Sequence, residues 1–183
     1  MSSDFVGLSE RDIMKIQREL GPGALQQVKE NPYILSRMFP LKVVDGVAAK
    51  LKVQQRGNIH RGVAIAEYEL DKQLNDGHCY VHTHTLVAKA CGDCKLLPTA
   101  FGPEQLGLHG TIVVEGKHAM LATIYEAEVL VASKIRELVE VGGLPEITIA
   151  LGESATALDL DQRVAVTHMI STSVSVVTGP PGV

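Results

Sequence analysis

The first third of the chain consists of short apolar stripes at helical spacing, separated by glycine and proline. Ser9 and Asp12 form a capping-box pair ahead of one stripe, which predicts a helix over residues 9–20. Further short helices are predicted over residues 24–30, 33–38 and 43–51. Because glycine or proline stops each stripe, the pattern predicts an array of short helices.

The middle of the chain switches between helical and alternating periodicity. The predicted elements are a helix over 61–74, a short strand over 78–81, a helix capped by Thr83 or Thr85 that runs to Cys91, a short helix over 103–108, a hairpin of 111–114 with 119–122, and a long helix over 125–141. The hairpin strands flank a glycine turn. The order helix, strand, helix, helix, hairpin is typical of a winged helix.

The C-terminal end carries a helix, a β-branched run and a glycine-proline segment in succession. Asp159 is the expected N-cap of a helix over 158–166, and residues 174–178 have the pattern of a buried strand. Gly179-Pro180-Pro181-Gly182-Val183 then fits the first five positions of a Walker A loop, G-x-x-x-x-G-K-[ST], whose backbone N–H groups hold phosphate. These five residues alone favour a flexible tail. The helix and strand before them shift the interpretation to a nucleotide-binding loop.

Composition narrows the class of protein. The chain has 183 residues, 45% hydrophobic and 21% charged, which is typical of a soluble globular protein. A protein dedicated to binding duplex DNA usually has a strongly basic surface, whereas this chain carries a net charge of −4. Any nucleic-acid contact is therefore expected to be local. Three cysteines argue against a disulfide framework and fit a reducing cytoplasm. No apolar run of about 18 residues predicts a membrane span, and no secretory signal is recognisable.

One basic stretch stands out in this acidic chain. Lys50, Lys52, Arg56 and Arg61 follow one another closely, and Lys42 lies shortly before them. Such cations can position a DNA backbone without reading its sequence, or they can belong to a solvated linker. The candidate recognition helix of the winged-helix region offers no such cation, since residues 96–110 contain neither Lys nor Arg. That region is therefore interpreted as a packing or partner-docking module.

A cysteine and histidine group forms a second candidate site. Its members lie within sixteen positions and are Cys79, His82, His84, Cys91 and Cys94. A C-x-x-C pair is half of a common zinc site, and a structural zinc would turn this region into a metal-stapled interaction module. Buried cysteine also serves simply as a small hydrophobe. The latter interpretation is preferred, and no metal is expected.

Several short motifs together resemble the helix-hairpin-helix region of RecD-type (RecD/TraA-like) superfamily 1 DNA helicases, related to the exodeoxyribonuclease V α-subunit. The matching pieces are Leu20-Gly21-Pro22-Gly23-Ala24-Leu25, Glu30-Asn31-Pro32-Tyr33-Ile34-Leu35, Val47-Ala48-Ala49-Lys50-Leu51, Gly77-His78-Cys79-Tyr80 and Ile124-Tyr125-Glu126-Ala127-Glu128. The chain departs from the family at Lys42-Val43-Val44, where the family has glycines. Val44 is expected to obstruct close approach of the backbone to a DNA phosphate.

The C-terminal end is similar to the opening of superfamily 1 helicases. The resemblance implies that Gln162 holds the adenine edge and that Gly179, Pro180, Pro181, Gly182 and Val183 begin the phosphate loop. It also implies ATP and Mg²⁺ as cofactors, 5′ to 3′ translocation on single-stranded or forked DNA, duplex unwinding, and a role in recombination or repair with other repair proteins as partners. Because the loop Lys and hydroxyl would follow Val183, the 183-residue chain alone is expected to lack ATPase and unwinding activity.

The expected fold is mainly α with a small β hairpin, an α+β class. Four regions are predicted: a helix-hairpin-helix-like region over 1–55, a winged-helix-like module with its long helix over 56–143, a connector over 144–158, and the start of a RecA-like motor domain over 159–183. A different class remains open, namely a non-enzymatic adapter that binds DNA ends or a repair partner.

Overall fold

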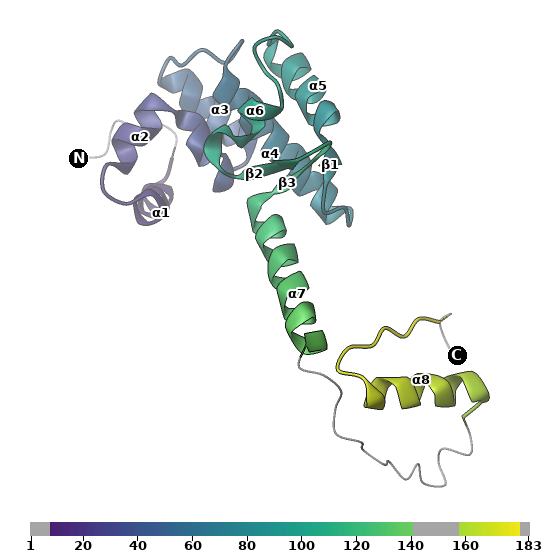
Figure 1. The fold of residues 1–183 in the computed structure, drawn as a ribbon. Helices are drawn as coiled ribbons and strands as arrows, with labels where there is room; N and C mark the ends of the chain where they lie inside the picture. Colours follow the sequence, from purple (N-terminus) through teal and green to yellow (C-terminus); the bar gives the residue numbers. More distant parts are fainter. Residues whose placement is uncertain (1–7, 141–157, 180–183) are drawn as a thin grey trace. The chain divides into compact units, whose positions relative to one another are not determined.

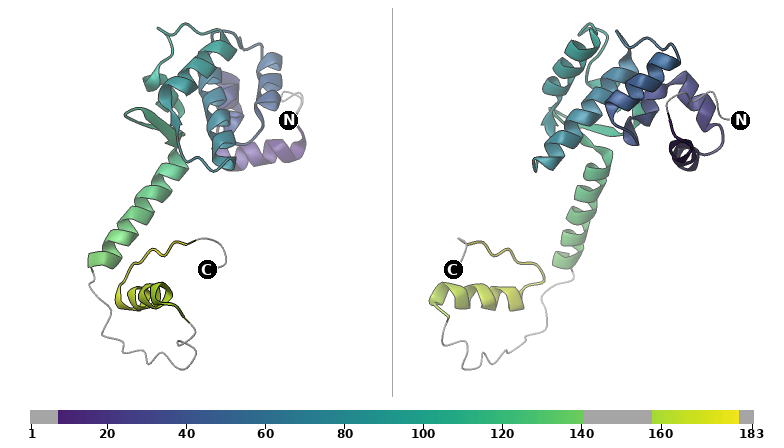
Figure 2. Two further views of the ribbon diagram at one scale, coloured as in Figure 1. Left: turned by 90° about the vertical axis from the view of Figure 1, so that its right-hand side faces the viewer. Right: turned by 180° about the vertical axis from the view of Figure 1, so that it is seen from behind.

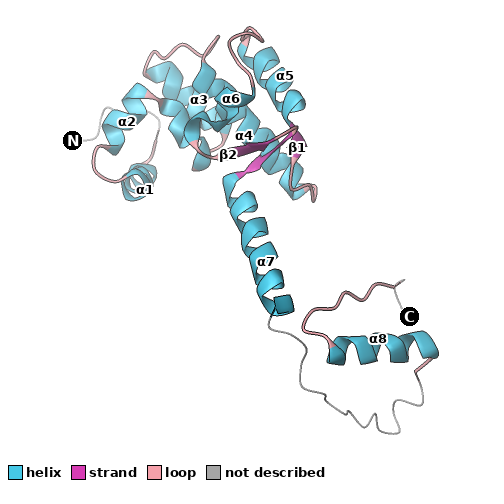
Figure 3. Ribbon diagram, viewed as in Figure 1, coloured by secondary structure: helices cyan, strands magenta, loops and turns pink. Residues whose placement is uncertain are grey.

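The computed structural model describes residues 8–140 and 158–179. The chain divides into two compact units, residues 1–125 and residues 126–183 (Figure 1). The described residues are mostly helical, with a three-stranded sheet in the first unit (Figure 3). This confirms the coarse α+β prediction. None of the helices in the described ranges is both long and apolar enough to cross a membrane.

The N-terminal half of the first unit is the predicted array of short helices. Its elements are α1 (Glu10–Leu20), α2 (Ala24–Glu30), the 3₁₀ helix η1 (Pro32–Arg37) and α3 (Leu41–Lys50). The Ser9 hydroxyl accepts from the Asp12 amide and the Asp12 carboxylate accepts from the Ser9 amide, so the predicted capping box is confirmed. Gly21 and Gly23 adopt positive φ angles of 69° and 83°, a conformation that glycine enters without steric cost.

The second half of the first unit wraps a small sheet with helices. Its elements are α4 (Ile59–Asn75), β1 (Val81–His82), α5 (Thr83–Cys94), α6 (Pro103–Leu106), the 3₁₀ helix η2 (Gly107–His109), β2 (Ile112–Glu115) and β3 (His118–Leu121). The sheet is antiparallel with the order β1-β3-β2. The predicted cap of α5 is wrong, because His82 occupies the N-cap and no side chain caps the helix. Thr83 is instead the first helical residue.

Two hydrophobic cores fill the first unit, and α4 contributes to both. The first core contains Ile16, Ala24, Val28, Tyr33, Leu35, Val44, Val47, Ala48 and Ala64. The second contains Val63, Ile65, Ala66, Leu70, Leu86, Ala90, Cys94, Leu96, Phe101, Leu106, Ile112 and Ala119. Figures 1 and 2 show α4 beside α3 and also beside α5. Helix α4 is therefore the wall that the two halves share.

The C-terminal helices expose most of their apolar residues. Helix α7 (Ala122–Glu140) crosses the boundary between the units, and α8 (Leu160–Ser171) follows in the second; neither contains a buried residue. Both helices extend beyond their predicted bounds. The predicted end of the long helix at 142–145 and most of the connector lie outside the described residues.

The predicted strand over 174–178 is wrong. These residues form no strand, and Val176 and Val177 are 85% and 56% exposed. A β-strand needs ladder hydrogen bonds to a neighbouring strand. The strands of the described part all belong to the first unit, so β-branched residues alone did not produce one here.

Candidate nucleic-acid interface

Four of the five cations predicted to contact DNA are exposed to solvent, and they belong to α3 and the loop after it. Lys42 lies in the first turn of α3, Lys50 is its last residue, and Lys52 and Arg56 follow in the loop; all four side chains are exposed. No ion pair holds any of them in the described part of the chain. Because no carboxylate of residues 8–140 or 158–179 forms an ion pair with them, these cations can contact phosphate. We call these four residues the α3 cation group.

The start of α3 adds a partial positive charge to this group. Pro40 occupies the N-cap and supplies no side-chain cap; its carbonyl accepts from the Val43 and Val44 amides, and the positive end of the helix dipole lies beside Lys42. Val44 is fully buried in the first core, with 0% exposure. The expectation that Val44 obstructs the close approach of a DNA phosphate to the backbone is therefore wrong. The apolar pattern of α3 turns this side chain inward, away from any approaching phosphate.

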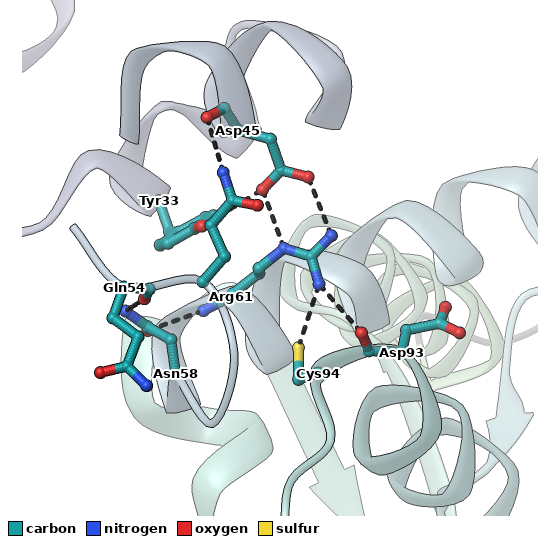
Figure 4. A network of polar contacts seen from close by, with 8 residues as sticks. Tyr33, Asp45, Gln54, Asn58, Arg61, Asp93 and Cys94 are labelled. Carbon is teal, nitrogen blue, oxygen red and sulfur yellow. Dashed lines mark hydrogen bonds and ion pairs between the residues drawn. The ribbon is translucent and has the colours of Figure 1, made fainter. Parts of the chain in front are cut away.

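Arg61 is placed differently from the other predicted cations (Figure 4). Its Nε and Nη2 donate to the two carboxylate oxygens of Asp45, each at 2.8 Å, and its Nη1 donates to the Asp93 carbonyl at 3.1 Å. The side chains of Arg61 and Asp45 are only 16% and 22% exposed. Hydrogen bonding to Asp45 raises the pKa of Arg61, against the effect of burial. Arg61 thus joins α4 to α3 and α5, and the α3 cation group does not include it.

The same network reaches two more side chains. The Tyr33 hydroxyl donates to Asp45 Oδ1 at 3.2 Å, and burial together with the Asp45 charge raises the pKa of Tyr33. The Cys94 thiol lies 3.6 Å from Arg61 Nη1 (Figure 4). Burial raises the pKa of Cys94, so this thiol stays protonated.

The predicted cysteine and histidine group does not assemble into a metal site. Cys79 is exposed, Cys91 is half-buried with its Sγ 3.9 Å from the Phe101 carbonyl, and Cys94 is buried in the second core. No set of three His, Cys, Asp or Glu side chains in residues 8–140 and 158–179 is arranged to hold a metal ion. His82 and His84 lie on the surface and contact other rings instead.

A buried carboxylate that the sequence did not single out joins the two halves of the first unit. Glu67 of α4 is 6% exposed and accepts from the hydroxyls of Ser36, at 2.5 Å, and Thr111. His109 Nδ1 lies 3.7 Å from its carboxylate, and His109 Nε2 lies 2.9 Å from His60 Nδ1. Burial raises the pKa of Glu67, but His109 and the two hydroxyls outweigh it and lower the pKa overall. The sequence signal that could have identified this residue was a glutamate within the apolar face of the helix predicted over 61–74.

The candidate nucleotide residues that the structure describes meet in the second unit. Gln162 and Gly179 line one cavity of about 470 Å³, together with Asp159, Asp161, Ala165, Val177 and Thr178. The Gln162 side chain also accepts from the Asp159 amide in a capping box at the start of α8, which confirms Asp159 as the N-cap. Pro180, Pro181, Gly182 and Val183 lie outside the described residues.

The lining of this cavity meets part of what ATP and Mg²⁺ would require. Gln162 keeps its amide nitrogen for an adenine edge, and the backbone at Gly179 can approach phosphate. Asp159 and Asp161 also line the cavity, and no lysine or arginine does so among the described residues. The lining therefore fits the base end of a nucleotide and lacks a cation for its phosphates.

A known protein family matches the N-terminal region of the chain. Residues 3–80 match the family model described as the ATP-dependent RecD2 DNA helicase HHH domain. The match covers the short helices, Lys42 to Arg61 and nearly all of the segment before β1. No curated protein matches the chain. The resemblance to the helix-hairpin-helix region of RecD-type helicases is thus confirmed for residues 3–80.

Proposed function

We propose that this chain is the accessory N-terminal part of an ATP-dependent DNA helicase that translocates 5′ to 3′ and acts in DNA recombination or repair. The match of residues 3–80 to the helix-hairpin-helix domain of RecD2 helicases supports the proposal. In this role the first unit contributes DNA-backbone contacts, and unwinding depends on a motor. The setting is cytoplasmic.

The observation that carries the DNA contact is the α3 cation group. Its four cations are exposed and form no ion pair with any residue that the structure describes, although the chain as a whole carries a net charge of −4. Lys42 and Lys50 stand at opposite ends of α3, about 12 Å apart along the axis at the usual helical rise. A cation track of this length can contact successive phosphates of one strand. The partner is single-stranded or forked DNA, bound weakly and without sequence readout.

The second half of the first unit acts as a winged helix in this proposal. The order α4-β1-α5-α6-β2-β3, with the antiparallel sheet β1-β3-β2, supports that assignment. Helix α6 has only four residues, PEQL, and carries no cation. A base-reading helix needs donors for base edges, so this module serves packing or partner docking.

The second part of the proposal is a nucleotide site in the second unit. Gln162 holds the adenine edge and Gly179 begins the phosphate loop, where bound ATP with Mg²⁺ would supply phosphoryl-transfer chemistry. We expect no ATP hydrolysis by the 183-residue chain, because its sequence contains no complete G-x-x-x-x-G-K-[ST] loop. A phosphate-release assay that found magnesium-dependent turnover by the purified chain would contradict this.

The central test is binding of the 183-residue chain to fluorescent single-stranded, duplex and forked DNA across a salt series. Log affinity should fall linearly with log salt, because each phosphate contact releases counterions. The variant Lys42→Gln/Lys50→Gln/Lys52→Gln should lower the salt slope by about 2 to 3 and weaken binding to all three DNA forms. The matched control is Lys29→Gln/Lys72→Gln/Lys95→Gln, which removes the same charge from exposed positions outside the group.

The outcomes separate the proposal from its alternative. Equal slopes for the two triple variants would show that only net charge matters and would remove the α3 cation group as a DNA contact. Absence of a salt-dependent affinity in the wild-type chain would favour the non-enzymatic partner-binding adapter. The exposed apolar residues of α7, including Val131 and Ile135 at 57% and 45%, would then be its first candidate surface.

A further inference from the structure

Four rings form a continuous band on the surface of the first unit. Tyr80 lies 4.5 Å from His118, His118 lies 5.2 Å from His82, and His82 lies 5.6 Å from His84, measured between ring centroids. Tyr80 is 53% exposed, His82 and His84 are exposed, and His118 is half-buried. We call Tyr80, His82, His84 and His118 the ring band. Neither the family match nor the proposed backbone contacts account for it.

The rings of the band are tilted against one another. Successive rings meet at 59°, 35° and 32°, so none of the three pairs is a parallel stack. The pair His60 and His109 shows the opposite arrangement, because these rings are stacked at 10° and lie inside the polar network around Glu67. A tilted, exposed ring can still accept a flat partner on its face.

The backbone holds the band in place. His82 of β1 and His118 of β3 are directly paired in the antiparallel sheet, which puts their side chains on one face. Tyr80 directly precedes β1, and His84 lies in the first turn of α5. The Thr83 amide donates to the Lys117 carbonyl at 2.9 Å, which ties the β2–β3 turn to the start of α5. The rings are thus presented by regular structure, as a stacking surface requires.

The charges near the band favour an anionic strand over an apolar partner. Residues 77–92 contain no aspartate or glutamate, and Lys117 of the β2–β3 turn adds an ammonium beside His118. His82, His118 and Glu115 are paired across the three strands, and among these three residues Glu115 alone carries a carboxylate. No set of three ligands in the described ranges suits a metal ion, so the histidines are not explained as a metal site.

We propose that the ring band is a stacking platform for unpaired bases of single-stranded DNA. Every base presents a flat face, and bases stack on tyrosine and histidine rings without regard to sequence. In a duplex these faces are occupied by neighbouring bases, so the platform selects single strands. The choice of DNA as partner rests on the proposed function, whereas the stacking itself rests on the ring geometry.

The test compares three ligands of equal length: oligothymidine, the same strand with abasic sites, and a duplex. The variant Tyr80→Ala/His118→Ala should weaken oligothymidine binding about tenfold, corresponding to one lost base–ring stack. Binding of the abasic strand and of the duplex should not change, because both retain phosphates and neither offers a free base face. The salt slope should also stay the same. Tyr68→Ala is the matched control, since Tyr68 is 56% exposed and lies outside the band.

A second variant separates stacking from folding. Tyr80→Phe/His118→Phe keeps two rings and should retain oligothymidine affinity, whereas loss of affinity in this variant would overturn the platform. Equal losses for all three ligands in the alanine variant would likewise overturn it. A change in affinity on adding EDTA would assign the histidines to a metal and contradict the proposal. If the α3 cation variant has no effect while the ring variant retains its selective effect, the proposed backbone contacts fail and the platform stands.

Discussion

Helices α3 and α4 are neighbours that carry similar residues in opposite surroundings. Helix α3 presents Lys42, Gly46 and Lys50 to water, whereas α4 takes Arg61, Gly62 and Glu67 out of it. The reason is packing, because α3 contributes to one core and α4 contributes to two. A charged residue near a recognisable motif says little about function until its interaction partners are known. Arg61 and Glu67 of α4 join parts of the first unit, whereas Lys42 and Lys50 of α3 are exposed and form no ion pair in the described part of the chain.

The largest expected effect concerns the two arginines that flank the start of α4. Arg61→Ala should lower the free energy of unfolding by about 3 kcal/mol, because it leaves the Asp45 carboxylate without its bidentate partner in a partly buried site. Arg56→Ala should change it by less than about 0.5 kcal/mol, since Arg56 is exposed and unpaired in the described part. Urea denaturation followed by circular dichroism measures both. Equal effects of the two substitutions on the free energy of unfolding would contradict the difference between the exposed α3 cation group, which includes Arg56, and the paired Arg61 of α4.

Replacing glycine by alanine should lower the free energy of unfolding at one position and raise it at another. A Cβ at Gly62 would lie 2.8 Å from Phe101 Cε2, so Gly62→Ala should destabilise the unit by about 2 kcal/mol through overpacking. A Cβ at Gly46 of α3 meets nothing within 4 Å, so Gly46→Ala should stabilise it by about 0.5–1 kcal/mol through higher helix propensity. Thermal melts of the two variants give the comparison. Stabilisation by Gly62→Ala would show that Phe101 can move aside.

The buried glutamate should matter less than the buried arginine. Glu67→Gln keeps the volume and the acceptor oxygen but removes the charge that faces His109, so we expect a loss of about 1 kcal/mol. Glu69→Gln is the control on the same helix, because Glu69 is half-buried with no ion pair in the described part. Urea midpoints of both variants should be measured at pH 7. A larger loss for Glu69→Gln would contradict the joining role of Glu67.

The smallest expected effect is a decline in stability on mild acidification. Burial and the charge of His109 lower the pKa of His60 from its ordinary 6.5, so the unfolded chain binds this proton first and stability begins to fall below pH 6.5. The pKa of Glu67 is also lowered, from 4.5, so its contribution is present above pH 4.5 and is lost as pH falls through the folded pKa. Urea midpoints from pH 8 to 4 measure this. In His60→Gln the decline should start at lower pH; an unchanged profile would exclude His60.

Local signals predicted the elements that local interactions stabilise. The capping box at Ser9, the N-cap at Asp159, the bounds of α2 and the glycine turn of the β2–β3 hairpin follow from residues only a few positions apart. The strand predicted at 174–178 failed because a strand depends on a neighbour that local sequence does not supply. The family motifs pointed to the right family for residues 3–80.

The sequence by itself determined the helical array, the hairpin, the sparse local basic stretch and the resemblance to a helicase N-terminal region. Only the tertiary structure decided which cations stay available, because Arg61 meets Asp45 across sixteen positions and Lys50 forms no ion pair within residues 8–140 and 158–179. It also decided that Glu67 joins the two halves, and that His82 and His118 share one face of a sheet. Periodicity reports which side of a helix or strand is buried. Partners distant in sequence are set by how the elements pack.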